Sequence, residues 1–338
     1  MATFAVARAV RGIEPLVAME IRRSRIGVVR GVRHREVWFE APPGADLLSL
    51  RTADDVLLAA AVVDGIGHDR SALGRLARAA RELDTGLLAR AGDGLEVSAS
   101  FVGRRNYTRF EIEDAVGTEL ARPLRLPYHS RRDGGRPPLD AMSWRVTIEG
   151  DQAVIAVRPG RRPLHRRAYK TASVRGTLHP PVAAAMAQLA RPAGAGTVLD
   201  PCCGAGTTLI EACAVAGPGV RMLGFDHDPA AVAAATANSG DHRASFAWAV
   251  ADGGRIPVAS GSADRVLVNP PWGRQVPPAG RLAGGLGPLW REVRRVLAPG
   301  GLAVALVHDE IPRGFAVEET IRVSLSGQHP VIAVLSVS

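Results

Sequence analysis

Four short apolar runs between residues 198 and 268 alternate with helical segments, and a polar residue comes at or just after the end of each run. The runs are Val198–Leu199, Met222–Phe225, Phe246–Val250 and Arg265–Val268, and the polar residues are Asp200, Asp226, Asp252 and Asn269. This alternation predicts a doubly wound, mostly parallel α/β sheet. Because ligands bind beyond the carboxyl ends of the strands in such sheets, we expect the four polar side chains to face one crevice. Further strands are expected at Leu302–Val307, Thr320–Leu325 and Val331–Val337.

The turn after the first run reads DPCCGAG and precedes a helix. Gly204 and Gly206 let a ligand approach the backbone, and the N–H groups at the helix start can bind an anion. The turn is neither the dinucleotide fingerprint G-x-G-x-x-G nor a P-loop. Asp226 stands where an acid can accept hydrogen bonds from a ribose, whereas Asp228 is expected to cap the next helix. Asp252 is expected to face an adenine amino group.

The sequence Asn269-Pro270-Pro271-Trp272 follows the fourth run directly. The exocyclic amine of a base is a poor nucleophile because its lone pair is delocalised into the ring. Acceptors such as the Asn269 side-chain oxygen and the Pro270 carbonyl can pull this nitrogen toward a tetrahedral, reactive form, and the proline pair fixes the carbonyl. Trp272 offers a flat face on which the base can stack. The four residues therefore predict a catalytic loop that aligns an amine with a methyl donor.

The first part of the chain has weaker patterns. We expect strands at Thr3–Ala9 and Val37–Glu40, helices at 12–23 and Ser71–Leu88, and either a helix or a strand at 54–63. These signals are typical of a small α+β unit with few strands. Beyond residue 94 we expect strands at Leu95–Phe101, Ser143–Ile148 and Ala153–Val157, and a helix at Glu111–Leu120.

The formal net charge is +9, and the 42 basic residues include a single lysine, an arginine bias that first indicates a GC-rich genome. The position of the charge says more, because residues 101–180 hold 16 basic and 8 acidic side chains. The run RPGRRPLHRRAYKTASVR at 158–175 contains no acid at all. Such a patch is typical of a phosphate-binding surface. The side chains expected to bind RNA are Arg161, Arg162, Arg166, Arg167 and Lys170.

Composition excludes several classes of protein. An apolar fraction of 46% supports a folded core and excludes a disordered chain. Three cysteines give neither a disulfide framework nor a zinc-binding spacing, so we expect no metal. No apolar run reaches the roughly 18 residues that span a bilayer, and the first residues lack the pattern of a secretion signal. We therefore expect a cytoplasmic protein without a membrane partner.

The second half of the chain resembles the class I S-adenosylmethionine-dependent methyltransferases. DPCCGAGTTLIEA is similar to their first motif, GFDHDP to their second, and NPPW to their amino-methylating fourth. The resemblance is most detailed for the THUMP-domain RNA guanine-N2 methyltransferases, in which a segment like PLHRRAYK at 163–170 precedes the first motif. GIEPLVAMEI resembles their ferredoxin-like domain, and residues from about 60 to 165 resemble the RNA-gripping THUMP domain.

This resemblance implies a ferredoxin-like domain at 1–60, a THUMP-like RNA-binding domain at 61–165, a linker at 166–180 and a Rossmann-like methyltransferase domain at 181–338. It implies S-adenosylmethionine as the cofactor, held by Asp200, Cys202, Gly204, Gly206, Thr207, Asp226, His227, Asp252, Gly253 and Asn269. It also implies that a monomer methylates the N2 amine of a guanosine in RNA, expected to be tRNA.

Departures from the family pattern leave the base and the substrate position open. Trp272 replaces the usual tyrosine, and Ala168 and Lys170 stand where glycine and arginine are common. The alternatives are ribosomal RNA or adenine N6 as substrate, a glutamine amide in a protein, and an RNA-binding protein with an inactive methyltransferase domain. The basic patch argues against a protein substrate, and the intact Asp226 and Asn269 argue against an inactive domain.

Overall fold

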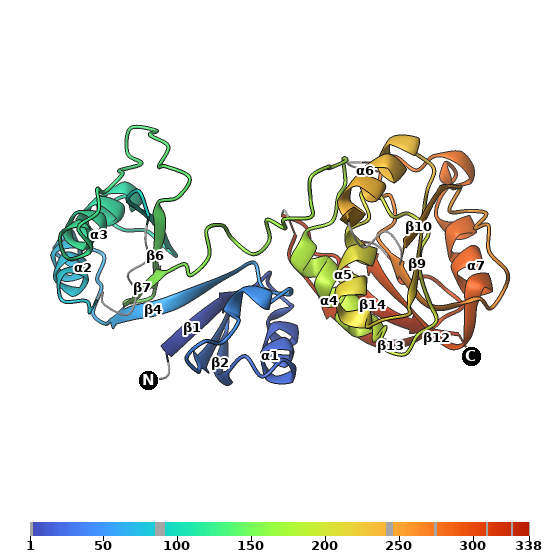
Figure 1. The fold of residues 1–338 in the computed structure, drawn as a ribbon, viewed down its shortest axis with the longest axis horizontal. Coiled ribbons are helices and arrows are strands. Elements are labelled where there is room, and N and C mark those ends of the chain that lie inside the picture. Colours follow the sequence, from blue (N-terminus) through green and yellow to red (C-terminus); the bar gives the residue numbers. More distant parts are fainter. Residues whose placement is uncertain are drawn as a thin grey trace. The chain divides into compact units, whose positions relative to one another are not determined.

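The computed structural model describes residues 3–84, 92–240, 246–273, 276–308, 310–325 and 327–337. The chain divides into two compact units. The first comprises residues 1–8, 21–49 and 55–164, and the second comprises residues 9–20, 50–54 and 165–338. Each unit is built on one seven-stranded sheet, and most elements of both are labelled in Figure 1.

The sheet of the first unit has the strand order β2-β3-β1-β4-β7-β6-β5 and is antiparallel except between β5 and β6. Its strands are β1 (Thr3–Arg8), β2 (Val28–Arg33), β3 (Glu36–Ala41), β4 (Asp55–Val63), β5 (Leu95–Phe101), β6 (Met142–Glu149) and β7 (Gln152–Val157). β4 pairs with β1 and β7, and Leu58 lies opposite both Ala5 and Val157. β4 thus continues as one strand across residue 60.

The expectation of few strands in this part of the chain was wrong. The segment 54–63 is a strand, and β2 was not predicted at all. β2 lies at the edge of the sheet and is largely exposed, so it lacks the buried, alternating apolar residues by which strands are usually found.

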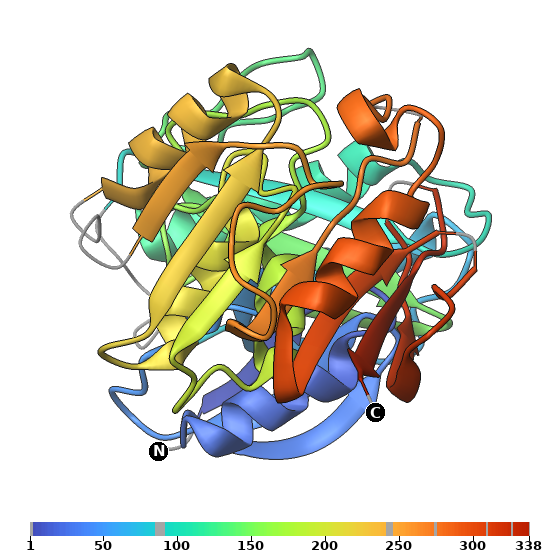
Figure 2. The same cartoon turned by 90° about the vertical axis from the view of Figure 1, so that its right-hand side faces the viewer.

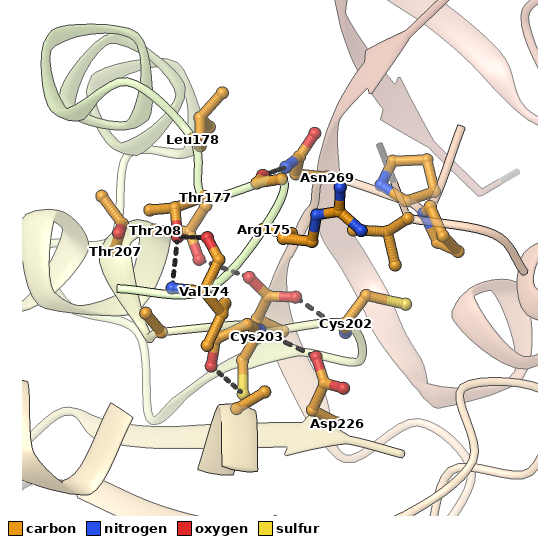
Figure 3. A pocket seen from close by; sticks show the side chains of 18 of the residues that line it. Val174, Arg175, Thr177, Leu178, Cys202, Cys203, Thr207, Thr208, Asp226 and Asn269 are labelled. Atoms are coloured by element: carbon orange, nitrogen blue, oxygen red, sulfur yellow. Dashed lines mark hydrogen bonds between the residues drawn. The ribbon is translucent and has the colours of Figure 1, made fainter. Parts of the chain in front are cut away.

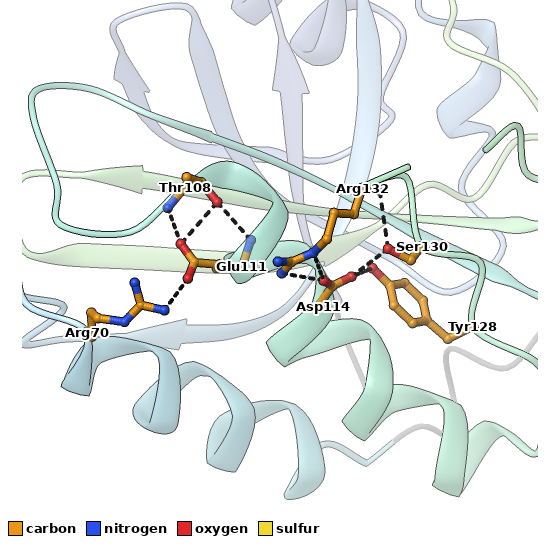
Figure 4. Close-up of polar contacts among 7 residues, drawn as sticks. All are labelled: Arg70, Thr108, Glu111, Asp114, Tyr128, Ser130 and Arg132. Carbon is orange, nitrogen blue, oxygen red and sulfur yellow. Dashed lines mark hydrogen bonds and ion pairs between the residues drawn. The ribbon is translucent and has the colours of Figure 1, made fainter. Parts of the chain in front are cut away.

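Three helices lie between these strands in the sequence, and they are α1 (Glu14–Arg23), α2 (Ser71–Arg81) and α3 (Arg109–Leu124). The first residues of α1 belong to the second unit. α3 begins with a capping box, in which Thr108 Oγ1 accepts from the Glu111 N–H at 3.3 Å and the Glu111 carboxylate accepts from the Thr108 N–H at 2.8 Å (Figure 4). Leu76, Ile112 and Trp144 belong to the buried core of this half. Residues 85–88 of the expected second helix lie outside the described residues.

The segment that follows α3 is fastened to the helix by one carboxylate. Asp114 accepts hydrogen bonds from the Tyr128 hydroxyl at 2.9 Å, the Ser130 hydroxyl at 2.7 Å and the Arg132 guanidinium at 2.7 Å (Figure 4). Burial raises the pKa of the Tyr128 phenol, and the Asp114 charge adds to that shift.

The sheet of the second unit has the order β10-β9-β8-β11-β12-β14-β13. Its strands are β8 (Thr197–Asp200), β9 (Arg221–Asp226), β10 (Phe246–Val250), β11 (Ala263–Val268), β12 (Leu297–Val307), β13 (Ala316–Arg322) and β14 (Val331–Ser336). The strands from β8 to β12 are parallel, and β14 is antiparallel to both of its neighbours. The predicted seven-stranded, mostly parallel α/β sheet is confirmed.

The strand order reverses between β8 and β11, which lie next to each other. Such a switch point leaves a crevice at the carboxyl ends of the two strands. The helices of this unit are α4 (Pro180–Ala190), α5 (Thr207–Ala216), α6 (Pro229–Ser239) and α7 (Gly287–Val296). Figure 1 shows α4 and α5 on one side of the sheet and α7 on the other, and α7 lies in front of the sheet in the turned view of Figure 2.

The helix α4 was not predicted from the sequence. All of its residues are buried, so its alanine-rich sequence has no polar face and no helical period to detect. Among the described residues, no helix is long and apolar enough to cross a membrane.

Candidate active site

A cavity of about 700 Å³ lies at the carboxyl ends of β8, β9 and β11. The four polar residues expected at one sheet edge all line it: Asp200, Asp226, Asp252 and Asn269. So do Cys202, Gly204, Thr207, His227, Gly253 and the loop residues Pro270, Pro271 and Trp272. Of the residues predicted to hold the cofactor, Gly206 alone does not line the cavity. Figure 3 shows part of this site.

Asp200 is fully buried and organises the glycine-rich turn. Its carboxylate accepts from the Cys202 N–H at 2.9 Å and from the Thr208 hydroxyl at the start of α5. Burial raises the pKa of Asp200 to about 7, so the group is partly protonated at neutral pH. Burial also raises the pKa of the Cys202 thiol well above its usual range, which keeps that thiol neutral.

Gly206 supports the site from behind rather than lining it. It precedes α5 with φ of +77°, a left-handed conformation that favours glycine. A Cβ atom here would lie 2.8 Å from the Trp248 ring and 3.1 Å from Ala235. The turn therefore packs against β10 and α6 with no room for a side chain.

We expect Gly206→Ala to unfold at a clearly lower denaturant concentration than the wild type and to bind S-adenosylhomocysteine more weakly. The variant adds a clash with Trp248 to the roughly 1–2 kcal/mol that the left-handed conformation costs a residue with a Cβ. Gly194→Ala is the matched control, because Gly194 has φ of +79° as the third residue of the hydrogen-bonded turn 192–195 and a Cβ atom added there would meet no described atom within 4 Å. Equal losses in both variants, measured by urea unfolding, would contradict the packing role.

Asp226 and Asp252 come at the ends of neighbouring strands and hold loop backbone. Asp226 accepts from the Gly204 N–H at 2.9 Å and from the Asp228 N–H at 3.0 Å. Asp252 accepts from the Gly254 and Arg281 N–H groups, each at 2.8 Å. Since a carboxylate has about four acceptor positions, both groups keep lone pairs for a ligand. Asp228 caps α6 by accepting from the Ala230 N–H at 2.8 Å, as predicted.

Asn269 follows β11 and presents an unused acceptor. Its Nδ2 faces the Gly176 carbonyl at 3.5 Å, while its Oδ1 is buried and no described residue donates a hydrogen bond to it. An unsatisfied buried acceptor is costly, which is a physical reason to expect a ligand donor at this atom. The Trp272 ring packs at 45° against the ring of His308.

The cavity lining fits S-adenosylmethionine. The Thr207 hydroxyl at the start of α5 is also buried without a partner among the described residues, next to a helix N-terminus that can bind a carboxylate. The carboxylates of Asp226 and Asp252 can accept from a ribose and an amino group. Gly204, at φ of +53°, leaves its part of the wall without a side chain.

A buried ion-pair cluster holds the segment that leads into the site. Glu211 on α5 is fully buried and accepts from Arg51 Nε at 2.7 Å, Arg167 Nε at 2.9 Å and the Tyr169 hydroxyl at 2.8 Å. Arg167 also donates to the Arg51 carbonyl. Sequence reasoning missed Glu211 and Arg51, although a single acid within the apolar stretch TTLIEACAVA was a usable signal.

The predicted RNA-binding residues separate into two groups. Arg162 and Arg166 are exposed, and Arg161 is exposed but pairs with Asp140. Lys170 is half-buried in the cavity wall, and burial lowers its pKa. The expectation for Arg167 needs correction, because its side chain is only 9% exposed and its guanidinium is bound to Glu211.

Comparison with known proteins shows the family of this chain. Residues 167–324 match the family model described as UPF0020, an RMKL-like methyltransferase domain. The chain is 32% identical over 304 residues to the tRNA (guanine(6)-N2)-methyltransferase of Thermus thermophilus, covering 86% of each chain. The crystal structure of TrmN from Thermus thermophilus superposes with a TM-score of 0.82 at 28% identity, covering 99% of this chain and 100% of that one.

A second structure, that of SMU.472, is titled a putative methyltransferase complexed with S-adenosylhomocysteine. It shares the fold with a TM-score of 0.76 at 17% identity over 100% of this chain and 98% of that one. The cofactor of this chain is S-adenosylmethionine. From the identity and coverage above, the chain belongs to the family of S-adenosylmethionine-dependent methyltransferases that includes the Thermus thermophilus tRNA (guanine-N2)-methyltransferase.

Proposed function

We propose that this protein transfers a methyl group from S-adenosylmethionine to the exocyclic N2 amine of a guanosine in RNA, and that this RNA is a tRNA. The observation that carries the proposal is the buried, unpartnered Oδ1 of Asn269, a residue that lines the same cavity as the carboxylates of Asp226 and Asp252. The name of the Thermus thermophilus relative supports guanine N2 as the position and tRNA as the substrate.

In the proposed mechanism, Asn269 Oδ1 and the Pro270 carbonyl accept the two hydrogens of the amine. These bonds localise the nitrogen lone pair and aim it at the methyl donor. S-adenosylmethionine supplies, when bound, a methyl group on a positively charged sulfur. No strong base is required, because the amine becomes acidic once the new N–C bond forms and its proton then leaves to water. The Asn269 side chain is oriented for this task by its contact with the Gly176 carbonyl.

The remaining parts of the chain are assigned to RNA binding. In this proposal residues 1–60 form a ferredoxin-like domain, 61–165 a THUMP-like domain, 166–180 a linker and 181–338 the methyltransferase domain. The N-terminal domains and the exposed arginines would hold the folded RNA by its backbone, and the target base would be turned out of its stack into the cavity. The same proposal has the protein acting as a cytoplasmic monomer without a metal.

In the decisive experiment the purified protein is incubated with labelled S-adenosylmethionine and, in separate reactions, with tRNA, ribosomal RNA or DNA. The nucleic acids are then digested, and the released nucleosides are identified by mass spectrometry. We expect N2-methylguanosine from tRNA. N6-methyladenosine, or methylation of ribosomal RNA alone, would contradict the proposal, and methylation of glutamine in an added protein extract would replace it.

Exchanging Arg166 for alanine is expected to weaken tRNA binding and to make the slope of log K against log salt shallower by about one unit, because one phosphate contact is lost. Arg166 is exposed and belongs to the acid-free run. Arg313→Ala removes the same charge from another exposed position of the same unit and serves as the control. An affinity for Arg166→Ala that matches the control across a salt series would rule out this contact.

A further inference from the structure

The acidic and the basic side chains that line the cavity come from different segments of the chain. The acidic side chains come from the ends of β8 and β9 and from the segment after β10, and they are Asp200, Asp226, Asp228 and Asp252. The basic side chains all come from the segment 165–179, and they are His165, Lys170, Arg175 and His179. In the proposed function the acidic side chains bind the hydroxyls and the amino group of the cofactor, and the basic side chains have no ligand.

Two of the four basic side chains form hydrogen bonds within the protein, and a third, Lys170, is half-buried. His179 Nε2 lies 2.6 Å from Asp54 Oδ1, and His165 Nδ1 lies 3.1 Å from the Asp54 carbonyl oxygen. The Glu211 charge acts on Lys170, whose ammonium is half-buried. Arg175 differs from them, because it is exposed and no described residue forms a hydrogen bond or ion pair with its guanidinium.

Arg175 is tied by its backbone to the catalytic loop. The next residue, Gly176, accepts the hydrogen bond from Asn269 Nδ2 at 3.5 Å. Gly176 has φ of +74°, and a Cβ atom there would lie 2.7 Å from Val276 Cγ2, so this segment packs closely against the loop that follows Trp272. In Figure 3 the Arg175 side chain extends toward the part of the cavity where Asn269 lies. A nucleotide with its amine at Asn269 therefore brings its backbone near a free guanidinium.

We propose that Arg175 binds a phosphate group of the nucleotide whose base amine is held by Asn269, and so positions that nucleotide for methylation. The inference rests on the proposed function in taking RNA as the substrate. A guanidinium forms two parallel hydrogen bonds to a phosphate and stays charged at any physiological pH, so it fixes both the position and the orientation of the backbone.

The carboxylate of the cofactor is the other anion that enters this cavity, and it has donors of its own. The N-terminus of α5 and the unpartnered Thr207 hydroxyl lie on the buried side of the cavity. Arg175 is exposed, as a group that meets a macromolecule must be. Exposure and freedom from partners therefore assign Arg175 to the RNA rather than to the cofactor.

The test measures binding without turnover, using the full chain saturated with S-adenosylhomocysteine. The ligands are the RNA trinucleotide ApGpA and the same trinucleotide with uncharged methylphosphonate linkages. We expect the wild type to prefer the charged form by about tenfold to a hundredfold. Arg175→Ala should lose this preference, Arg175→Lys should keep part of it, and Arg313→Ala should behave as the wild type.

A wild type without preference for the charged trinucleotide, or an Arg175→Ala variant that keeps the full preference, would overturn the inference. Unchanged trinucleotide binding with a loss of S-adenosylmethionine affinity would overturn it too, because Arg175 would then serve the cofactor. The trinucleotide ApApA, which has the same phosphates but no guanine N2 amine, is measured as well, so that the phosphate contact is tested apart from the proposed function. A phosphate preference that depends on Arg175, together with tRNA that gains no N2-methylguanosine, would leave the phosphate contact standing and reject guanine N2 as the methylated position.

Discussion

Asn269→Ala is expected to lower the turnover number at least about a hundredfold while the affinity for S-adenosylhomocysteine stays within a few-fold of the wild type. The substitution removes the buried Oδ1, the acceptor to which no described residue donates, and leaves the carboxylates at the ends of β8 and β9 in place. Preorganised hydrogen-bonding groups that act in the transition state contribute effects of this size in enzymes. The turnover number is measured in a methylation assay with RNA in excess, and the affinity for S-adenosylhomocysteine by calorimetry, on the same preparation.

Two further variants show whether the loss is chemical. Asn269→Asp keeps an acceptor oxygen, so it should retain more activity than alanine does. Asn238→Ala removes a buried amide that forms hydrogen bonds with the backbone of Thr171, Ala172 and Ala205 in the same unit. We expect this variant to lose mainly stability. Wild-type turnover by Asn269→Ala would show that another group activates the amine.

The arrangement of the site could be predicted because it depends on the order of residues along short strands. Asp200, Asp226, Asp252 and Asn269 come at or just after strand ends in the sequence, and parallel pairing brings these ends to one edge. That inference needs no knowledge of side-chain packing. The chemical role of each residue does not follow from this placement, and it stays a prediction that the variants test.

The features that sequence reasoning missed leave no signal in the local sequence pattern. Arg167 was predicted to bind RNA because its neighbours in sequence are basic, whereas its partner Glu211 lies on α5. α4 was missed because a helix buried on every side shows no period, and β2 because an exposed edge strand shows no buried alternation. Arg167 therefore needed knowledge of a distant partner, whereas α4 and β2 lack the periodic pattern by which helices and strands are found.

The same reasoning predicts the largest effect on stability, at Glu211. Replacing this side chain by alanine leaves Arg167 buried without its counter-charge, and breaking a buried pair in this way costs about 3–5 kcal/mol. We expect Glu211→Ala to unfold at a much lower urea concentration, and Glu211→Gln to recover only part of the loss because its amide hydrogens oppose the arginine donors.

Glu319→Ala is the matched control, since Glu319 is an exposed acid on β13 of the same unit and should change stability by less than about 0.5 kcal/mol. Because Glu211 holds Arg167 and Tyr169, which lie in the segment 165–179, its loss should also weaken trinucleotide binding at temperatures where the variant remains folded. A Glu211→Ala protein as stable as the Glu319→Ala control would mean that the arginines regain their hydration when the carboxylate is removed, and that the cluster contributes nothing to holding this segment in place.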